Sequence, residues 1–447
     1  MSLAELHDAE ALPAAGTRAY ELARRIFPIC RSITGAGVKQ TLAILGERIP
    51  LTLHEVPSGT KVFDWEVPHE WNIRDAYIED ASGRRVVDFA RSNLHVVSYS
   101  TPVRQTLTLD ELRPHLHSLP DHPDWIPYRT SYYRPNWGFC LAHRDLEALQ
   151  PGRYEVVIDA TLEPGHMTYG ECFLPGQTEQ EVIVFSHVCH PSLANDNCSG
   201  LAVATEIAAA LRGKPRHFSY RFVFAPGTIG AITWLAQNEQ RLGRIAHGLV
   251  IGLLGDPGPL TYKKSVQGTA LVDRAAVHVL GRLGADSRIE DFSPYGYDER
   301  QFNSPGINLP VGRLTRSPNG AYPQYHTSAD NLDLIQPRYL AESIGACAQI
   351  LDVIDGEGVY RNLSPKCEPQ LGKRGLYRAT GGTGPGEFEH ALFWVLNQSD
   401  GRRSLLDIAE RARIPFGVIQ SAATALAGAG LLARQNVSVP SSGEERA

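Results

Sequence analysis

The most constraining stretch of this chain couples a predicted strand to a predicted helix through a loop that carries a histidine and an aspartate. The apolar, β-rich run Val182–Phe185 is typical of a buried strand, and the run stops at His187. After a loop, small residues from Gly200 to Leu211 predict a helix, and Asp196 stands just before it. An imidazole at a strand's carboxyl end and a carboxylate before a helix share the sheet edge where open α/β folds bind ligands.

A simpler interpretation makes Asp196 the N-cap of the helix and His187 an ordinary histidine at a strand end. A second segment far downstream, Tyr325–Asn331, favours a site instead, because it contributes His326 and Asp330. Together the two motifs resemble the zinc exopeptidases, which include bacterial aminopeptidases and glutaminyl cyclases. More narrowly, the sequences HVCHPSLANDNCSG, YDERQF and YHTSADNLD resemble a family of uncharacterised three-domain aminopeptidase-like proteins.

The resemblance implies an α/β fold with a mixed, largely parallel sheet, helices on both faces, an inserted mostly-β domain and a C-terminal winged helix. Predicted strands and helices alternate after the first motif, as in a parallel sheet. Short alternating runs, turn signals and many Pro, Trp and Tyr residues predict the mostly-β insert at 57–168. The aminopeptidase-like domain is then expected to comprise 1–56 plus 169–366. Residues 367–447 are expected to form a Gly/Pro-rich linker and a winged helix-turn-helix-like domain.

His187, Asp196 and His326 form a set of two imidazoles and one carboxylate, and the resemblance implies the same three metal ligands. Three protein ligands with a fourth position left for water are typical of catalytic zinc. Zinc lowers the pKa of its bound water towards about 7 and polarises a carbonyl, which suits amide hydrolysis. Manganese and iron are alternatives to zinc for this ligand set. His190, three residues after His187, is a competing ligand or else lines the pocket.

Two departures from the exopeptidase pattern bear on the number of ions. The exopeptidases have an acid two residues after the first ligand histidine, where this chain has Cys189. They also carry a glutamate pair after the next strand, whereas Ala225–Gly230 contains no carboxylate and has Gly227 in place of a glutamate. We therefore expect the site to hold one Zn²⁺ ion. This motif does not identify the general base.

The segment Tyr297–Phe302 resembles the Ser-Asp-His-x-x-Phe segment of the exopeptidases. In this interpretation Asp298 lies behind the ligands or faces a substrate amine, and Glu299 is a candidate base. Arg300 could hold a substrate carboxylate as a bidentate fork, and Tyr325 could donate to an oxyanion. The alternative is a surface cluster of charges beside a tyrosine that simply packs.

Partners and location follow from composition. The seven cysteines are scattered without a Cys-x-x-Cys pair, which fits a reducing cytoplasm. No signal peptide, no apolar run of membrane-spanning length and a net charge of −6 give no reason to expect a membrane partner. The candidate recognition helix within Phe416–Ala433 contains no Lys or Arg, so no nucleic acid is expected as a partner. A homo-oligomer stays open.

A cluster of aromatic residues in the insert forms either a substrate-binding wall or part of a core. Its members are Trp125, Tyr128, Tyr132, Tyr133 and Trp137. The sequence as a whole predicts a cytoplasmic, zinc-dependent, aminopeptidase-like hydrolase of an amide bond that acts on a peptide or a small molecule. The alternatives are a biosynthetic tailoring amidohydrolase or cyclase for a small non-peptide substrate, and a non-catalytic metal-binding scaffold.

Overall fold

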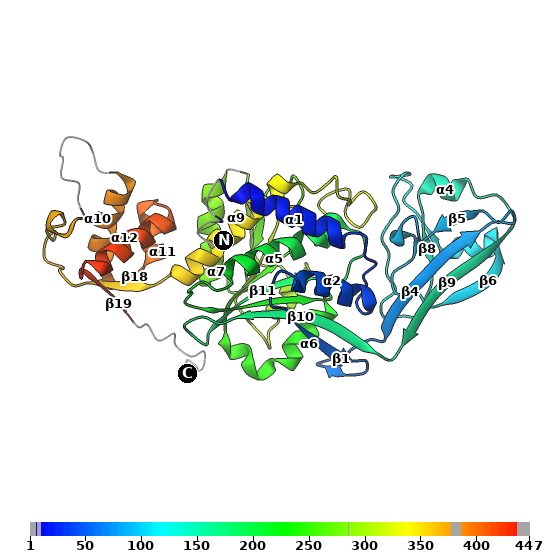
Figure 1. Ribbon diagram of the computed structural model, residues 1–447, viewed down its shortest axis with the longest axis horizontal. Coiled ribbons are helices and arrows are strands. Elements are labelled where there is room, and N and C mark those ends of the chain that lie inside the picture. The colour runs from blue at the N-terminus through cyan, green and yellow to red at the C-terminus, as the bar shows by residue number, and fades with distance from the viewer. Residues whose placement is uncertain (1–5, 7–9, 285, 377–385, 436–447) are drawn as a thin grey trace. The chain divides into compact units, whose positions relative to one another are not determined.

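The structure, a computed structural model, describes residue 6 and residues 10–284, 286–376 and 386–435. The chain divides into two compact units, Met1–Gln349 and Ile350–Ala447 (Figure 1). The predicted Gly/Pro-rich linker, 379–386, lies outside the described residues except for its last glycine.

A large mixed sheet carries the first unit. Among the described residues it has eight strands in the order β1-β10-β12-β11-β13-β16-β14-β15. Their bounds in that order are Thr52–Pro57, His166–Leu174, Ser219–Ala225, Glu181–His187, Ile245–Ile251, Val311–Thr315, Thr261–Lys263 and Arg288–Glu290. The central strands β12, β11, β13 and β16 run parallel, and β1 and β10 pair antiparallel with their neighbours. Strand β14 pairs antiparallel with β16 and parallel with β15. Every residue of β11 and β12 is buried, as expected for parallel strands covered on both faces.

Helices cover both faces of this sheet (Figure 1). Helices α5 and α1 pack together on one face, and α6 and α8 contact each other on the other. The bounds are α1 Leu12–Ile26, α2 Ala36–Gly46, α5 Gly200–Leu211, α6 Ile229–Gln237, α7 Leu271–Leu283, α8 Glu299–Phe302 and α9 Pro337–Gly356. The buried carboxylate of Glu206 in α5 pairs with Arg18 of α1 and with Arg48 just after α2, which fixes these helices to one another. The predicted α/β fold with a mixed, largely parallel sheet is confirmed.

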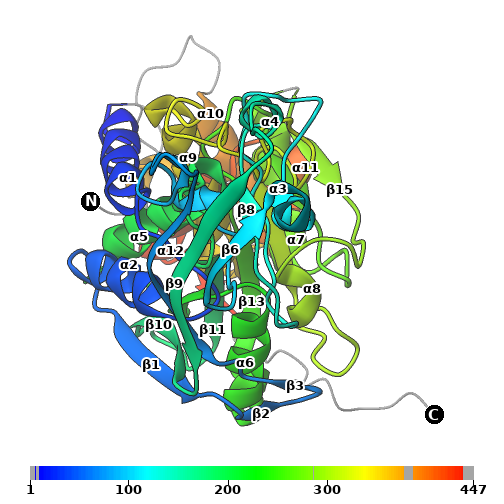
Figure 2. The ribbon, with the colours of Figure 1, turned by 90° about the vertical axis from the view of Figure 1, so that its right-hand side faces the viewer.

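The region between β1 and β10 forms a second sheet with the strand order β5-β4-β9-β6. The bounds are β4 Glu70–Glu79, β5 Arg85–Asp88, β6 Val103–Thr108 and β9 Arg153–Glu163. Smaller elements of the same region are β2 Lys61–Val62, β3 Trp65–Glu66, α3 Leu109–Leu112, β7 Leu116–His117, β8 Phe139–Cys140 and α4 His143–Glu147. Figure 2 looks onto this region and shows β9 crossing in front of the larger sheet. One hydrophobic cluster joins Trp71 and Val156 of this region to Phe185 and Val223 of the large sheet. Its core is therefore continuous with that of the main fold, and the boundaries 57 and 168 stay predictions.

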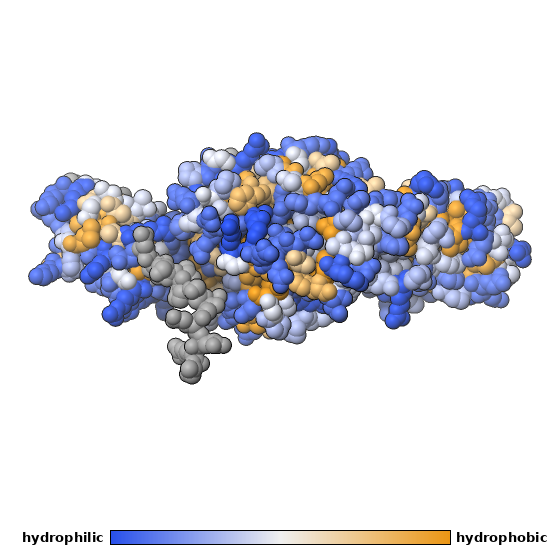
Figure 3. Space-filling model, turned by 90° about the horizontal axis from the view of Figure 1, so that it is seen from below, coloured by the Kyte–Doolittle hydropathy of each residue, from blue (hydrophilic) through white to orange (hydrophobic). Residues whose placement is uncertain are grey.

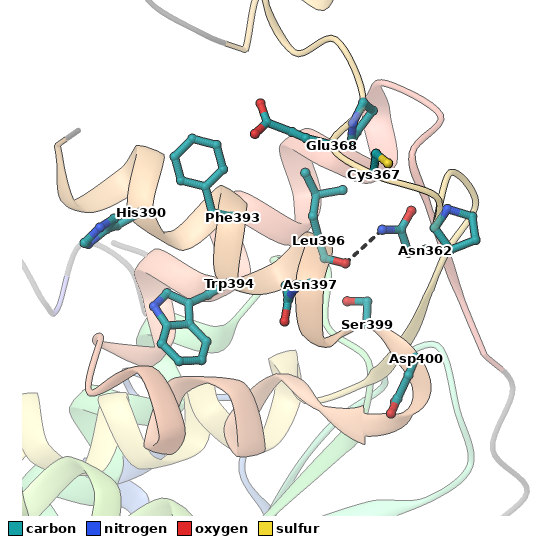
Figure 4. A pocket seen from close by; sticks show the side chains of 12 residues that line it. Asn362, Cys367, Glu368, His390, Phe393, Trp394, Leu396, Asn397, Ser399 and Asp400 are labelled. Atoms are coloured by element: carbon teal, nitrogen blue, oxygen red, sulfur yellow. Dashed lines mark hydrogen bonds between the residues drawn. The ribbon is translucent and has the colours of Figure 1, made fainter. Parts of the chain in front are cut away.

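After the end of α9, the described residues of the second unit form three α-helices and a small sheet. The bounds are α10 Glu387–Gln398, α11 Leu405–Ala412, α12 Phe416–Gly428, β17 Val359–Asn362, β18 Asp400–Ser404 and β19 Leu432–Arg434. The central strand of the order β18-β17-β19 is β17, which lies before the predicted boundary at 367. The sequence pattern did not place this strand, because four residues carry too little alternation to identify it. A hollow of about 650 Å³ beside α10 is lined by Phe393 and Trp394 (Figure 4).

The surface gives little further guidance to function. In the part of the chain that the structure describes, no helix is both long and apolar enough to cross a bilayer. The face drawn in Figure 3 is mostly hydrophilic, with apolar residues gathered in small groups. Scattered apolar residues of this kind are normal on protein surfaces.

Candidate active site

His187 is the last residue of β11 and is 2% exposed. Its Nε2 atom lies 2.7 Å from Oδ1 of Asp196, and its Nδ1 atom lies 3.9 Å from Oδ2 of Asp298. Burial lowers the pKa of His187, so the ring is neutral at physiological pH. A neutral buried imidazole is the form that binds a metal ion.

Asp196 lies in the irregular segment Ala194–Ser199, which leads into α5. Its carboxylate does not cap the helix; it faces His187 on one side and Nε2 of His326, at 3.2 Å, on the other. Burial by itself raises the pKa of Asp196, but the imidazoles of His190 and His187 bring it well below its usual value. The simpler N-cap interpretation is therefore wrong.

Asp330 holds the Asp196 segment in place from behind. Its two carboxylate oxygens accept hydrogen bonds from the backbone N–H groups of Asn195 (2.6 Å) and Asp196 (3.0 Å). The Tyr322 hydroxyl donates to the same carboxylate at 3.1 Å. Burial raises the pKa of Asp330 to about 7. The sequence motif included Asp330, but no sequence signal gave it this positioning role.

His326 lies in the loop after β16 and is held between aromatic rings. Tyr325 stacks on it with ring centroids 3.9 Å apart and an interplanar angle of 13°. Tyr128, from the insert, meets it edge-on at 5.1 Å, and the Tyr128 N–H donates to the His326 carbonyl at 2.8 Å. The ring is thereby fixed with Nε2 towards Asp196.

His190 completes the cluster. It is 4% exposed, and its Nδ1 atom lies 3.9 Å from Oδ1 of Asp196. Ligand atoms of His187, His190 and Asp196 all lie within 4.8 Å of one another. Burial lowers the pKa of His190 to about 3, so this ring too is a neutral donor. His326 does not belong to this group, although its Nε2 atom lies 3.2 Å from the other oxygen of Asp196, so the choice that the sequence left open stays open.

Asp298, just before α8, is fully buried, and neither carboxylate oxygen has a hydrogen-bond partner among the described residues. Burial raises its pKa well above the usual value, and the neighbouring Glu299 adds to this. Buried polar atoms are paired in nearly all proteins. Asp298 faces the ring nitrogen of His187 that points away from Asp196, where a carboxyl group can orient a metal-binding imidazole.

The other predicted catalytic residues lie differently. Glu299 is buried, with Oε1 2.5 Å from Nζ of Lys263 and 3.6 Å from Nη1 of Arg313. Despite burial, Arg313 and Lys263 lower its pKa, so this is not the free general base that the sequence suggested. Arg300 is exposed. The Tyr325 hydroxyl accepts a hydrogen bond from Asn319 at 3.1 Å.

The aromatic cluster of the insert divides between two roles. Tyr128 faces the site through His190 (5.3 Å) and His326, and its hydroxyl lies 2.6 Å from that of Tyr132. Trp125 and Trp137 instead stack on histidines of their own region, and Tyr133 is 52% exposed. Part of the predicted wall therefore lines the site.

Tyr297 was missed by sequence reasoning. Its ring lies 4.5 Å from that of His187, and its hydroxyl lies 3.3 Å from the Gly227 carbonyl and 3.5 Å from the Cys189 sulfur. Burial raises its pKa well above the usual value, so the phenol keeps its proton. Both positions that depart from the exopeptidase pattern are therefore in contact with one tyrosine.

The family described as "Domain of unknown function (DUF4910)" has a model that matches residues 20–357, and a winged helix-turn-helix model matches residues 358–434. The chain belongs to the DUF4910 family. A relative from Clostridium acetobutylicum is 52% identical over 412 residues, which are 92% of this chain and 95% of the relative. The name of that relative assigns it, provisionally, to polysaccharide biosynthesis and gives it an aminopeptidase-like domain.

Solved structures agree with this family assignment. A Clostridium acetobutylicum protein provisionally called a peptidase has a TM-score of 0.90 at 49% identity, over 95% of this chain and 98% of its own. The zinc aminopeptidase of Bacillus subtilis has a TM-score of 0.55 at 14% identity, over 75% and 94%. A peptidase M28 precursor from Shewanella amazonensis also has a TM-score of 0.55 at 14% identity, over 78% and 97%. The DUF4910 fold is thus that of the zinc aminopeptidases, and the resemblance predicted from the motifs is confirmed.

Proposed function

We propose that this DUF4910 protein is a zinc-dependent hydrolase that cleaves an amide bond in an aminopeptidase-like site. The observation that carries the proposal is the buried cluster of His187, His190 and Asp196, which the partly exposed His326 approaches through Asp196, with the unpaired carboxyl group of Asp298 beside it. Nitrogen and oxygen donors of this mixture suit a first-row divalent cation, and zinc above all.

The residues present fit one such cation. The Asp196 carboxylate lies at Nε2 of His187, where the two can share an ion, and Asp298 lies at Nδ1 of the same ring, where a carboxyl group can orient the imidazole. When bound, the cation would supply Lewis acidity towards a substrate carbonyl and towards water. We propose His187, Asp196 and His326 as its ligands, with His190 as either a ligand or a pocket wall. Asp298 faces the other ring nitrogen of His187 and would orient that imidazole.

The surrounding residues have roles of their own in this proposal. Asp330 positions Asp196 through two backbone hydrogen bonds. Tyr297, protonated and beside His187, can donate a hydrogen bond to an oxygen that develops negative charge. Glu299 acts as the anion between Lys263 and Arg313, because a carboxylate with a lowered pKa is a weak base.

Metal content and turnover of the purified full chain test the proposal. We expect about one zinc per chain in the wild type and loss of the metal in His187→Ala and His326→Ala. Asp298→Asn should weaken metal retention, whereas the exposed residue Asp333, changed to Asn, should leave it unchanged. Wild-type protein without stoichiometric metal after expression in zinc-supplemented medium would contradict the proposal. Metal without turnover of any amide would favour the non-catalytic scaffold.

A second candidate function is a tailoring amidohydrolase that acts on an amide attached to a sugar. The name of the 52% identical relative, which refers to polysaccharide biosynthesis, supports it. A parallel screen of aminoacyl amides and N-acyl amino sugars separates the two candidates, because each predicts turnover in one panel and not in the other.

A further inference from the structure

Two cations face each other across neighbouring strands close to the candidate metal site. Lys263 ends β14 and lies directly opposite Arg313 of β16 in the antiparallel register. The two side chains are buried, with exposures of 8% and 6%. Like charges directly opposite in a sheet destabilise it, so this pair requires negative charge nearby.

Glu299 is the buried carboxylate that pairs with both cations, and Arg313 also acts electrostatically on the buried Asp298. Glu299 lies 2.5 Å from Lys263 and 3.6 Å from Arg313. Lys263 is otherwise satisfied, because it donates to the carbonyls of Ser293 (3.2 Å) and Tyr295 (2.7 Å). One positive charge therefore remains in excess among these three side chains.

Arg313 carries that excess and has a donor to spare. One of its terminal nitrogens donates to Oδ1 of Asn319, but its buried Nε has no hydrogen-bond partner among the described residues. An unpaired buried donor costs free energy, and more when it carries charge. The Arg313 guanidinium therefore has an N–H donor for which the described residues provide no hydrogen-bond acceptor.

A small cavity lies at this guanidinium. It has a volume of about 110 Å³, and Lys263, Arg313, Asn319 and Gly296 are among the residues that line it. A Cβ atom at Gly296 would lie 1.9 Å from Oε1 of Glu299 and 2.5 Å from Nζ of Lys263, so only glycine leaves the cavity floor in this form. A space of this volume accepts a carboxylate or a phosphate group. The one acidic residue of the lining, Glu290, is exposed at the rim.

The cavity is one tyrosine away from the candidate metal ligands. Asn319, in its wall, donates to the Tyr325 hydroxyl at 3.1 Å, and the Tyr325 ring stacks on His326 at 3.9 Å. A molecule whose reacting amide lies at His326 could therefore extend past Tyr325 and place a terminal group in the cavity.

We propose that this cavity is an anionic subsite, in which Arg313 binds an oxyanion, a carboxylate or a phosphate, carried by the substrate, and Lys263 adds positive charge. The proposal deepens the proposed function and rests on it for the word substrate, but the anion site itself does not depend on a metal. Arg313 offers the N–H donors of its guanidinium, and Lys263, whose own donors are paired, adds a point charge. Arg300, the residue predicted from the sequence to bind a carboxylate, is exposed outside this cavity, so Arg313 replaces it in this role.

Titration of the metal-free full chain with acetate and with inorganic phosphate tests the site independently of the hydrolase proposal. We expect saturable binding of at least one probe, about tenfold or more weaker in Arg313→Gln and in Lys263→Gln. Lys264→Gln is the matched control, because this neighbouring lysine pairs with Asp291 and does not line the cavity. Arg313→Lys keeps the charge and loses Nε, so it should bind more weakly than the wild type and more tightly than Arg313→Gln. The comparison of the two probes tells a carboxylate site from a phosphate site.

Equal affinity in the wild type and in both cavity variants, each with an unchanged unfolding temperature, would overturn the proposal, and so would failure of the wild type to bind either probe. Should the cavity variants fold poorly, a second measurement on the zinc-loaded wild type decides. If acetate is the preferred probe, this measurement compares KM for leucylglycine with KM for leucylglycinamide. If phosphate is preferred, it tests whether inorganic phosphate competes with the substrate. A lower KM for the free carboxylate, or competition in KM without a change in kcat, supports the subsite; indifference to both overturns it.

Discussion

At the scale of single residues, the missing glutamate of the exopeptidase pattern has a steric counterpart. A Cβ atom at Gly227 would lie 2.3 Å from Cε1 of Tyr297. The tyrosine ring thus fills the space into which a side chain at 227 would project. The absence of a carboxylate at Gly227 and the presence of the Tyr297 ring therefore depend on each other sterically.

Gly227→Ala should destabilise the first unit by about 1–3 kcal/mol, because an added methyl group in a filled site forces its neighbours to move. Tyr297→Leu in the same chain should remove much of this penalty. Chemical denaturation of both single variants and the double variant measures the coupling free energy. Strictly additive effects would show that the ring and residue 227 do not compete for space.

Asp330 allows a second prediction at this scale. Asp330→Asn should lower zinc affinity about 10- to 100-fold, the usual effect of removing a group that orients a metal ligand. The cause is loss of one of the two acceptors that hold the backbone at Asn195 and Asp196. Competition with a zinc chelator measures the affinity, and the exposed Asp333→Asn serves as the control. Equal zinc affinities in the wild type, Asp330→Asn and Asp333→Asn would show that Asp330 does not position the metal ligand.

At the scale of elements, strongly patterned segments could be predicted from the sequence and short ones could not. The helix at 200–211 has the predicted bounds, because it carries a continuous run of helix-forming residues. The apolar run Leu271–Leu283 likewise predicts a helix with the bounds observed. The run Ile307–Leu314 predicts a strand, but the strand begins only at Val311, since Asn308 has a φ of +48° and Pro310 has no N–H to donate. The three-residue strands β14 and β15 were not predicted, because so few residues show no period.

The same distinction holds for the site. His187, Asp196 and His326 could be selected from the sequence because their motifs are local, and the structure brings them together. The environment of Glu299 could not be predicted from the sequence, because only the fold brings the strands that carry Lys263 and Arg313 close to it. A run of Asp, Glu and Arg looks like a surface cluster in sequence; here Asp298 and Glu299 are buried and Arg300 is not.

Helix α11 of the winged unit is capped by a residue distant in sequence. The Glu357 carboxylate accepts the backbone N–H groups of Leu405 and Leu406, each at 3.0 Å. Burial raises the pKa of Glu357 to about 6. Because the folded-state pKa lies above the unfolded value, the proton binds the folded state more tightly. The resulting stability is fully present below pH 4.5 and is lost as the pH rises through 6.

We therefore expect α11 to lose about 1–2 kcal/mol of local stability between pH 4.5 and pH 7. Hydrogen exchange of peptides that cover Leu405–Ala412 measures this in the full chain, with intrinsic exchange rates corrected for pH. Glu357→Gln removes the titrating group, so its α11 should show no such change. If α11 exchanged equally fast in the wild type and in Glu357→Gln at every pH, Glu357 would not be the group that causes the change.

At the scale of the whole molecule, metal removal should act on one unit only. A ligand at 100 times its dissociation constant stabilises a folded unit by about 2.7 kcal/mol. The proposed ligands all belong to the unit Met1–Gln349, so chelation should lower protection there and leave α10–α12 unchanged. Hydrogen exchange with and without a chelator distinguishes this outcome from general destabilisation, in which both units would lose protection.

The winged unit gives a prediction about partners. Helix α12 contains no Lys or Arg, so the helix expected to enter a DNA groove has no side chains for phosphates. We expect no saturable binding of the full chain to duplex DNA at physiological salt, measured by fluorescence anisotropy. Binding in the nanomolar range that weakens steeply with salt would show instead that this unit is a DNA-binding module.

Residues 126–128 of the insert and 326–328 of the histidine loop are joined by main-chain hydrogen bonds, from Tyr128 to His326 and from Ser328 to Ile126. The inserted segment therefore cannot be excised as a dispensable cassette. A shortened gene without it would leave the carbonyl of His326 unpaired and one side of its ring bare, so the truncated product should fail in chemistry even where its large sheet still folds.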